Sequence, residues 1–169
     1  TRYGTVTGVQ TCALPISLPH YPFPFQLRLE LRLEPAALAI TTRIHHSGAA
    51  GAAPMPFSFG LHPYFRVADP AAARIEGLPA SCVDHHSMEP AATADRLQRL
   101  GEGVDLFCAA AGPVRLVDPA AGLAITLETV APFDCVVVWT ETPRPMVCLE
   151  PWTAPRQSLL SGERRLDRK

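Results

Sequence analysis

The sequence has no long apolar run and no cluster of charge of one sign. No stretch reaches the roughly 20 consecutive apolar residues that a membrane-spanning helix needs, and the first residues show no basic region followed by a long apolar core. The 15 Lys and Arg residues nearly balance the 16 Asp and Glu residues, which leaves a formal net charge of -1. Nothing in this distribution favours nucleic acid or an anionic membrane as a partner. We therefore expect a soluble, cytoplasmic protein that binds a small neutral or modestly charged molecule.

Several motifs that would define a chemistry are also missing. The sequence has no G-x-S-x-G turn of the kind that carries a hydrolase serine, and no glycine-rich loop that could hold a phosphate. The cysteines form no C-x-x-C pair, so we expect reduced and mostly buried thiols and no structural zinc site. The five cysteines are Cys12, Cys82, Cys108, Cys135 and Cys148.

The hydrophobic pattern present in the 169 residues predicts one sizeable core built from strands. Residues 25–34 alternate between apolar and polar side chains, residues 38–44 do the same, and the turn between them predicts a β-hairpin. Only residues 91–100 have any helical character, and Gly101 ends that segment early. The predicted class is all-β, an antiparallel β-sandwich. Further strands are predicted over residues 74–78, 114–117, 123–130, 135–140 and 146–150, with Pro, Gly and Asp between them.

The first sixteen residues do not fit this pattern. The run from Val6 to Ile16 has neither helical nor strand periodicity, and it resembles, residue for residue, the translation of a common sequencing-library adapter. We predict that residues 1–16 are non-native and that residues 17–169 form the domain, in part. Resequencing the source DNA tests this, because an intact junction without adapter sequence would refute it.

One motif gathers special residues around a histidine. Residues 59–65 read Phe-Gly-Leu-His-Pro-Tyr-Phe, at a point where a loop re-enters a strand. Pro63 restricts His62 to an extended backbone, and Tyr64 and Phe65 can supply one apolar wall. Taken alone, a single histidine is more often a core residue that hydrogen-bonds a backbone carbonyl.

A second motif places a carboxylate at the end of an apolar strand. Residues 147–155 read Val-Cys-Leu-Glu-Pro-Trp-Thr-Ala-Pro. Burial of Glu150 beside Trp152 would raise the pKa of its carboxyl group toward neutrality and suit it to proton transfer. When this segment is taken alone, a solvated glutamate at a strand end is an equal alternative.

Together the two motifs resemble those of the aldose 1-epimerase (galactose mutarotase-like) family. In that family the histidine of an H-P-Y-F or H-S-Y-F segment and the glutamate of a C-terminal E-P segment are the catalytic pair. The resemblance covers most of the chain after Phe23, with an M-P-F-x-x-G-x-H-P-Y-F block, a V-D-L-F stretch and V-C-L-E-P-W-T-x-P. It implies a galactose mutarotase-like supersandwich in which His62 is the acid, Glu150 is the base and Asp105 contacts sugar hydroxyls.

The implied reaction interconverts the α and β anomers of a hexose or a hexose 6-phosphate. A base removes the proton of the C1 hydroxyl while an acid protonates the ring oxygen, and the two transfers reverse after the opened aldehyde has rotated. This chemistry needs no metal and no organic cofactor. Tyr64 and Trp152 are candidate sugar-binding residues, with Trp139 and Phe65 as further stacking candidates. Each aromatic is equally well explained as ordinary core.

The chain departs from the family in length, because family members carry an additional N-terminal portion with an arginine and usually another histidine that grip the sugar. A truncated sheet exposes edge strands, so we predict that this chain is weakly active or inactive and that its oligomeric state is open. Neither histidine pair is expected to replace the missing ligands. The pair His45-His46 is predicted at the surface of a strand end, and His85-His86 in a solvated loop.

Two alternatives to an epimerase stay open at this point. A non-catalytic carbohydrate-binding sandwich is one, and a structural domain of a larger carbohydrate-processing enzyme is another. A glycosidase is disfavoured because a single acid/base carboxylate does not supply the usual pair. Arg66, Arg144 and Arg156 are candidates to reach a sugar phosphate, although isolated arginines on β-protein loops are usually solvated.

Overall fold

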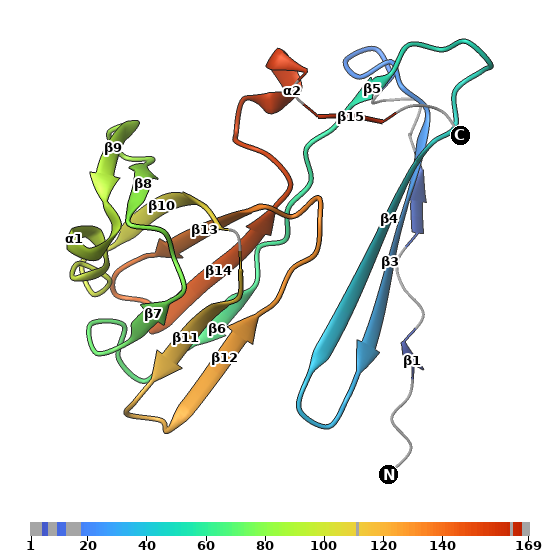
Figure 1. The fold of residues 1–169 in the computed structure, drawn as a ribbon. Coiled ribbons are helices and arrows are strands. Elements are labelled where there is room, and N and C mark those ends of the chain that lie inside the picture. The colour runs from blue at the N-terminus through green and yellow to red at the C-terminus, as the bar shows by residue number, and fades with distance from the viewer. Residues whose placement is uncertain (1–4, 7–9, 13–17, 111, 163, 167–169) are drawn as a thin grey trace. The chain divides into compact units, whose positions relative to one another are not determined.

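The computed structural model describes residues 5–6, 10–12, 18–110, 112–162 and 164–166. The chain divides into two compact units, each with its own sheets (Figure 1). The first unit combines Thr1–Phe57 with Gly162–Lys169, and the second is Ser58–Ser161.

The first unit is built on the long hairpin that the alternating pattern predicts. Strands β3 (Phe25–Leu33) and β4 (Leu38–His46) pair antiparallel along their whole length, from Phe25 opposite His46 to Leu33 opposite Leu38. Two short strands, β1 (Thr5–Val6) and β2 (Gln10–Cys12), also pair with β3, and β15 (Arg165–Leu166) pairs with β5 (Met55–Pro56). Part of the segment predicted to be non-native thus lies beside β3, while the origin of residues 1–16 stays a prediction.

The histidine pair at the end of β4 is divided between the two faces of the hairpin. His45 is exposed, as predicted, but the prediction of a surface position is wrong for His46, which is 2% exposed. Its Nδ1 lies 3.1 Å from the carbonyl oxygen of Pro24 and its Nε2 lies 3.2 Å from that of Ala53. The physical reason is the period of the strand, because His46 continues the inward row that includes Ile44.

The second unit contains two antiparallel sheets. The larger has the order β6-β14-β13-β10-β8-β9 and the smaller has the order β12-β11-β7 (Figure 1). The strands are β6 (Tyr64–Arg66), β7 (Arg74–Glu76), β8 (Ser81–Asp84), β9 (Glu89–Ala92), β10 (Val104–Ala109), β11 (Val114–Asp118), β12 (Leu123–Leu127), β13 (Cys135–Thr140) and β14 (Met146–Trp152).

The core lies between these two sheets, which confirms the predicted all-β antiparallel sandwich. One row of side chains from the larger sheet, which includes Leu106, Val138 and Leu149, packs with Val114 and Leu116 of β11. All five of these side chains are almost completely buried. Successive strand residues point to opposite faces, so the residues between them in sequence face the other side of the larger sheet. That outer face carries the candidate site.

Strands β8, β9 and β10 of the larger sheet were not predicted from the local pattern. Strands β8 and β9 are short and β9 contains proline, so their pairing beside β10 in the larger sheet decides their conformation more than their propensity does. The segment with weak helical character forms only α1 (Thr93–Leu97). Neither α1 nor α2 (Ser158–Ser161), the two helices in the described part of the chain, has the length and apolar character to cross a membrane.

Candidate active site

The outer face of the larger sheet bears a cavity with polar and aromatic walls. Its centre is formed where Glu150 of β14 lies opposite Val137 of β13, and where Trp139 of β13 lies opposite Asp105 of β10. The cavity volume is about 240 Å³. It is lined by His62, His85, Asp105, Val137, Trp139, Glu150, Trp152 and Arg156.

The structure brings together the histidine and glutamate of the two sequence motifs. His62 Nε2 lies 3.1 Å from Glu150 Oε1, with the imidazole half exposed and the carboxylate side chain 2% exposed. The segment before His62 runs beside the end of β14: Thr153 donates its backbone N–H to the Phe59 carbonyl at 2.9 Å, and Leu61 donates to the Pro151 carbonyl at 3.1 Å. These backbone bonds fix His62 next to Glu150.

Gly60 makes room for the indole that binds the same carboxylate. Gly60 and Trp152 form an isolated antiparallel bridge, and a Cβ atom on Gly60 would lie 2.6 Å from Trp152 Cδ1. Such a distance is far below a normal contact, so only glycine permits the indole in this position. From there Trp152 Nε1 donates a hydrogen bond of 3.1 Å to Glu150 Oε2.

The electrostatics of the site favour a protonatable Glu150. Burial raises the pKa of the Glu150 carboxyl group and Asp105 adds to the rise, while His62, the Trp152 hydrogen bond and His85 oppose it. The net pKa is above the ordinary value, because removal from water penalises the charged form more than these partners favour it. Of the two positions considered from the sequence, buried beside Trp152 or solvated at a strand end, Glu150 therefore occupies the buried one.

His85 is a site residue that the sequence analysis missed. The prediction of a solvated loop is correct for the exposed His86 but wrong for His85, whose side chain is 7% exposed. His85 Nδ1 lies 2.8 Å from Asp105 Oδ1, and the His85 backbone N–H donates to the Asp105 carbonyl at 2.8 Å. Its ring lies 5.9 Å from that of Phe107 and 6.3 Å from that of Trp152. Two hydrogen bonds and two aromatic neighbours hold this imidazole in the cavity wall.

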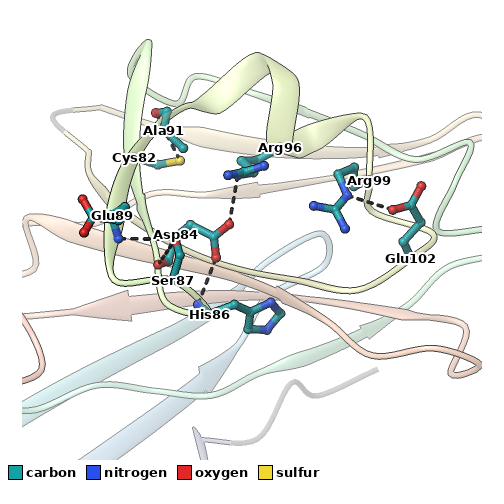
Figure 2. A network of polar contacts seen from close by, with 9 residues as sticks. All are labelled: Cys82, Asp84, His86, Ser87, Glu89, Ala91, Arg96, Arg99 and Glu102. Atoms are coloured by element: carbon teal, nitrogen blue, oxygen red, sulfur yellow. Dashed lines mark hydrogen bonds and ion pairs between the residues drawn. The ribbon is translucent and has the colours of Figure 1, made fainter.

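The turn that positions His85 is organised by its neighbour Asp84, whose side chain contacts His86 and Arg96 (Figure 2). Asp84 Oδ1 accepts the His86 backbone N–H at 2.9 Å, and Oδ2 lies 2.9 Å from Arg96 Nε of α1. The Asp84 carbonyl accepts the Met88 N–H at 2.7 Å, and Met88 has a positive φ of 60°. An aspartate at the start of a short loop is a turn signal, and this signal could have identified the hairpin of β8 and β9.

The aromatic side chains of the first motif divide between the site and the core. The rings of Tyr64 and His62 stack with centroids 4.8 Å apart and an interplanar angle of 16°, and Trp139 meets His62 edge-on at 5.6 Å. Tyr64 is 57% exposed. Phe65, the next residue, packs against the core. Of the two roles considered for it, sugar stacking and ordinary core, it has the second.

The three candidate arginines also differ in position. Arg156 lines the cavity. Arg144 forms an exposed ion pair of 2.9 Å with Glu141, and the exposed Arg66 lies on β6 opposite Met146. Of the three, Arg156 is the one placed to meet a charged group on a ligand in the cavity.

Beneath the catalytic-pair candidates lies a buried thiol. Cys148 is opposite both Tyr64 and Trp139 in the sheet and is fully buried. Burial, and secondarily the charge of Glu150, raises the pKa of this thiol to about 12. Cys82 and Cys108 are likewise buried and free, and Cys135 is buried. A donor atom of Cys148, one of His62 and one of Glu150 all lie within 4.8 Å of one another, which makes them a possible metal-ligand set.

Comparison with known proteins identifies a family for this sequence. The family model for aldose 1-epimerase matches residues 10–164. None of the curated proteins matches this sequence.

Several solved structures share the fold. The Slr1438 protein of Synechocystis sp. PCC 6803 has a TM-score of 0.87 and 23% identity over 98% of this chain. A galactose mutarotase-like protein of Clostridium acetobutylicum has a TM-score of 0.69 and 14% identity over 99% of this chain. One of Lactobacillus casei ATCC 334 has a TM-score of 0.64 and 18% identity over 89%. The matches cover 61%, 60% and 60% of those three chains, respectively.

Proposed function

Because the chain belongs to the aldose 1-epimerase family, we propose that it interconverts the α and β anomers of a hexose by acid–base ring opening. The observation that carries the proposal is the 3.1 Å contact between His62 Nε2 and Glu150 Oε1 in the wall of a cavity. The contact joins two residues that are far apart in sequence and places a proton donor beside a proton acceptor. Because this chain spans about three fifths of the related structures, we expect a slow turnover.

The proposed reaction uses the pair as base and acid in turn. Glu150 removes the proton of the C1 hydroxyl, the bond between C1 and the ring oxygen breaks, and protonated His62 gives its proton to that oxygen. Rotation about the C1–C2 bond and reversal of both transfers then produce the other anomer. The two reacting oxygens are attached to the same carbon, so an acid and a base in mutual contact can each reach one of them. Each group ends the first half-reaction in the state that the second half requires.

The remaining residues of the cavity suit a sugar. The Asp105–His85 pair offers polar atoms for hydroxyl groups, and its Nδ1–Oδ1 hydrogen bond leaves His85 Nε2 for the ligand. The indoles of Trp139 and Trp152 provide apolar surface of the kind that packs on a sugar face. Tyr64 acts in this proposal through His62, on whose ring it stacks.

A charged sugar is a second possibility within the same reaction. Arg156 brings a guanidinium group to the cavity, and guanidinium groups bind phosphate in a bidentate fashion. A hexose 6-phosphate would then be preferred over the free hexose. Substitution of Arg156 by Gln would remove that preference, whereas Arg144→Gln, at an exposed ion pair, would leave it unchanged.

The test is anomer exchange, measured by NMR magnetisation transfer on glucose, galactose and glucose 6-phosphate. The chain is compared with His62→Gln, and with His86→Gln as a control at an exposed histidine. We expect exchange above the spontaneous rate for the parent and the control, and none for His62→Gln. Exchange that is equally fast with His62→Gln would contradict the proposed acid.

Binding can be followed separately from turnover. The sequence contains two tryptophans, and both line the cavity, so intrinsic fluorescence reports on this site. Saturable fluorescence change without exchange would support a non-catalytic carbohydrate-binding protein instead. If the chain shows neither a fluorescence change nor anomer exchange with these sugars, the proposed function is wrong.

A further inference from the structure

His62 and Glu150 lie close to a buried thiol, that of Cys148, which the proposed reaction does not use. Cys148 precedes Glu150 by two residues on β14, so both side chains point to the outer face of the sheet. His62 reaches the same point from the neighbouring segment of the chain. One nitrogen, one sulfur and one oxygen donor thus lie within 4.8 Å of one another.

The spacing of these donors is close to that required by a tetrahedral cation. Zinc bonds of 2.0–2.3 Å at tetrahedral angles place two ligand atoms about 3.5 Å apart. The His62–Glu150 pair is at 3.1 Å, and the other distances are no longer than 4.8 Å. The half-exposed imidazole of His62 can rotate to close the difference, whereas Cys148 and Glu150 are fixed in the sheet.

The surroundings of the donors also fit a metal ion. Trp152 Nε1 holds the second oxygen of Glu150, an outer hydrogen bond of the kind that orients metal-ligating carboxylates. Trp139 and Tyr64 flank Cys148 on the two neighbouring strands. A thiolate and a carboxylate would neutralise a divalent charge, and a water molecule can complete the four-coordinate shell.

We propose that Cys148, His62 and Glu150 form a binding site for a thiophilic divalent cation such as Zn²⁺, and that the bound cation blocks the cavity. A thiolate, an imidazole and a carboxylate together select soft or borderline metals over Mg²⁺ or Ca²⁺. The cation takes the place of the proton between His62 and Glu150, so both groups lose their capacity for proton transfer. It is an inhibitor and not a cofactor, and its binding does not depend on the proposed sugar chemistry.

The test uses Cd²⁺ as a spectroscopic probe of the whole purified chain under a non-thiol reductant. A Cd²⁺–thiolate bond produces a ligand-to-metal charge-transfer band in the ultraviolet, which is titrated at neutral pH. We expect one equivalent of Cd²⁺ to saturate this band. Loss of a residue that only hydrogen-bonds to a metal ligand already weakens metal binding by about 10- to 100-fold. Because Cys148 is a ligand itself, Cys148→Ala should weaken Cd²⁺ binding by at least about 100-fold and remove the band.

Matched variants keep the assignment falsifiable. Cys82→Ala removes another buried free thiol, which contacts the Ala91 carbonyl and is not part of the donor group, and should leave the titration unchanged. His62→Gln alters a half-exposed side chain, so it tests the site even if Cys148→Ala fails to fold, and should weaken Cd²⁺ binding by at least about tenfold. No saturable band, a band that survives Cys148→Ala, or one insensitive to His62→Gln would overturn the proposal.

Turnover provides a separate readout. Where the chain accelerates anomer exchange, Zn²⁺ should inhibit it competitively with the sugar, and a chelator should restore it. The spectral titration needs no turnover, so failure of the sugar reaction and failure of the metal site are told apart. If the chain binds Cd²⁺ at Cys148 but does not accelerate anomer exchange, the metal-site proposal is supported and the proposed reaction is refuted.

Discussion

The substitution Glu150→Gln is expected to change activity and stability in opposite directions. The amide has nearly the size of the carboxylate and keeps an oxygen for the Trp152 hydrogen bond, so the change removes the base while preserving the packing. General-base catalysis contributes about 10²- to 10⁴-fold to a rate. At about 1.36 kcal/mol per factor of ten, the loss corresponds to about 2.7–5.4 kcal/mol of transition-state stabilisation.

The gain in stability follows from the buried charge. Burial raises the pKa of Glu150 in the folded protein, so the folded state holds the proton more tightly than the unfolded state does. Stability from this group is fully present below the unfolded pKa and is lost as the pH rises through the folded pKa. Glutamine does not ionise, so the variant should be more stable than the parent at pH 8, and the difference should shrink toward pH 4.

The assay combines NMR exchange with thermal unfolding at both pH values. Glu141→Gln is the matched control, because Glu141 is an exposed partner of Arg144 and should change neither quantity appreciably. In the parent, the rate should fall as the pH drops through the raised pKa of Glu150. This fall should occur at a higher pH than the ordinary pKa of a glutamate. Unchanged exchange in Glu150→Gln would refute this reasoning. So would a stability gain of the variant over the parent that is smaller at pH 8 than at pH 4.

Three further substitutions test the sugar-binding residues of the site, the position of the Trp152 indole and the packing of the core. His85→Ala should raise the KM for the sugar more than it lowers kcat, while His86→Ala should change neither; equal effects of the two in kinetics and fluorescence titration would contradict a role for His85 in binding. Gly60→Ala should displace the Trp152 indole, since the added Cβ would lie 2.6 Å from Cδ1, and an emission spectrum identical to the parent would show otherwise. Leu149→Ala, at a fully buried core position, should cost about 2–5 kcal/mol of unfolding free energy in urea titrations, and a loss below about 1 kcal/mol would mean that the core is looser than the structure shows.

The sequence by itself determined the elements whose pattern is local. The alternation of apolar and polar residues along β3 and β4 identified the hairpin, because the two faces of a strand have different surroundings. The continuous apolar runs of β13 and β14 likewise marked strands that are buried on both sides. The motifs around His62 and Glu150 were readable for a related reason, since in each a proline directly follows the histidine or the glutamate and an aromatic residue comes next.

The tertiary structure alone decided which ionisable groups meet. Two adjacent histidines, His85 and His86, look alike in a polar segment, and pairing of β8 with β10 buries only the one that reaches Asp105. The surroundings of His46 and Cys148 were likewise decided by the fold: His46 lies against the carbonyl of Pro24, and Cys148 lies between the two neighbouring strands β13 and β6. Strand period is a property of consecutive residues, whereas burial and electrostatic environment depend on cross-strand partners that are distant in sequence. The local pattern of β14 could therefore indicate a strand with Cys148, Glu150 and Trp152 on one face. Only the assembled sheet placed Glu150 against His62.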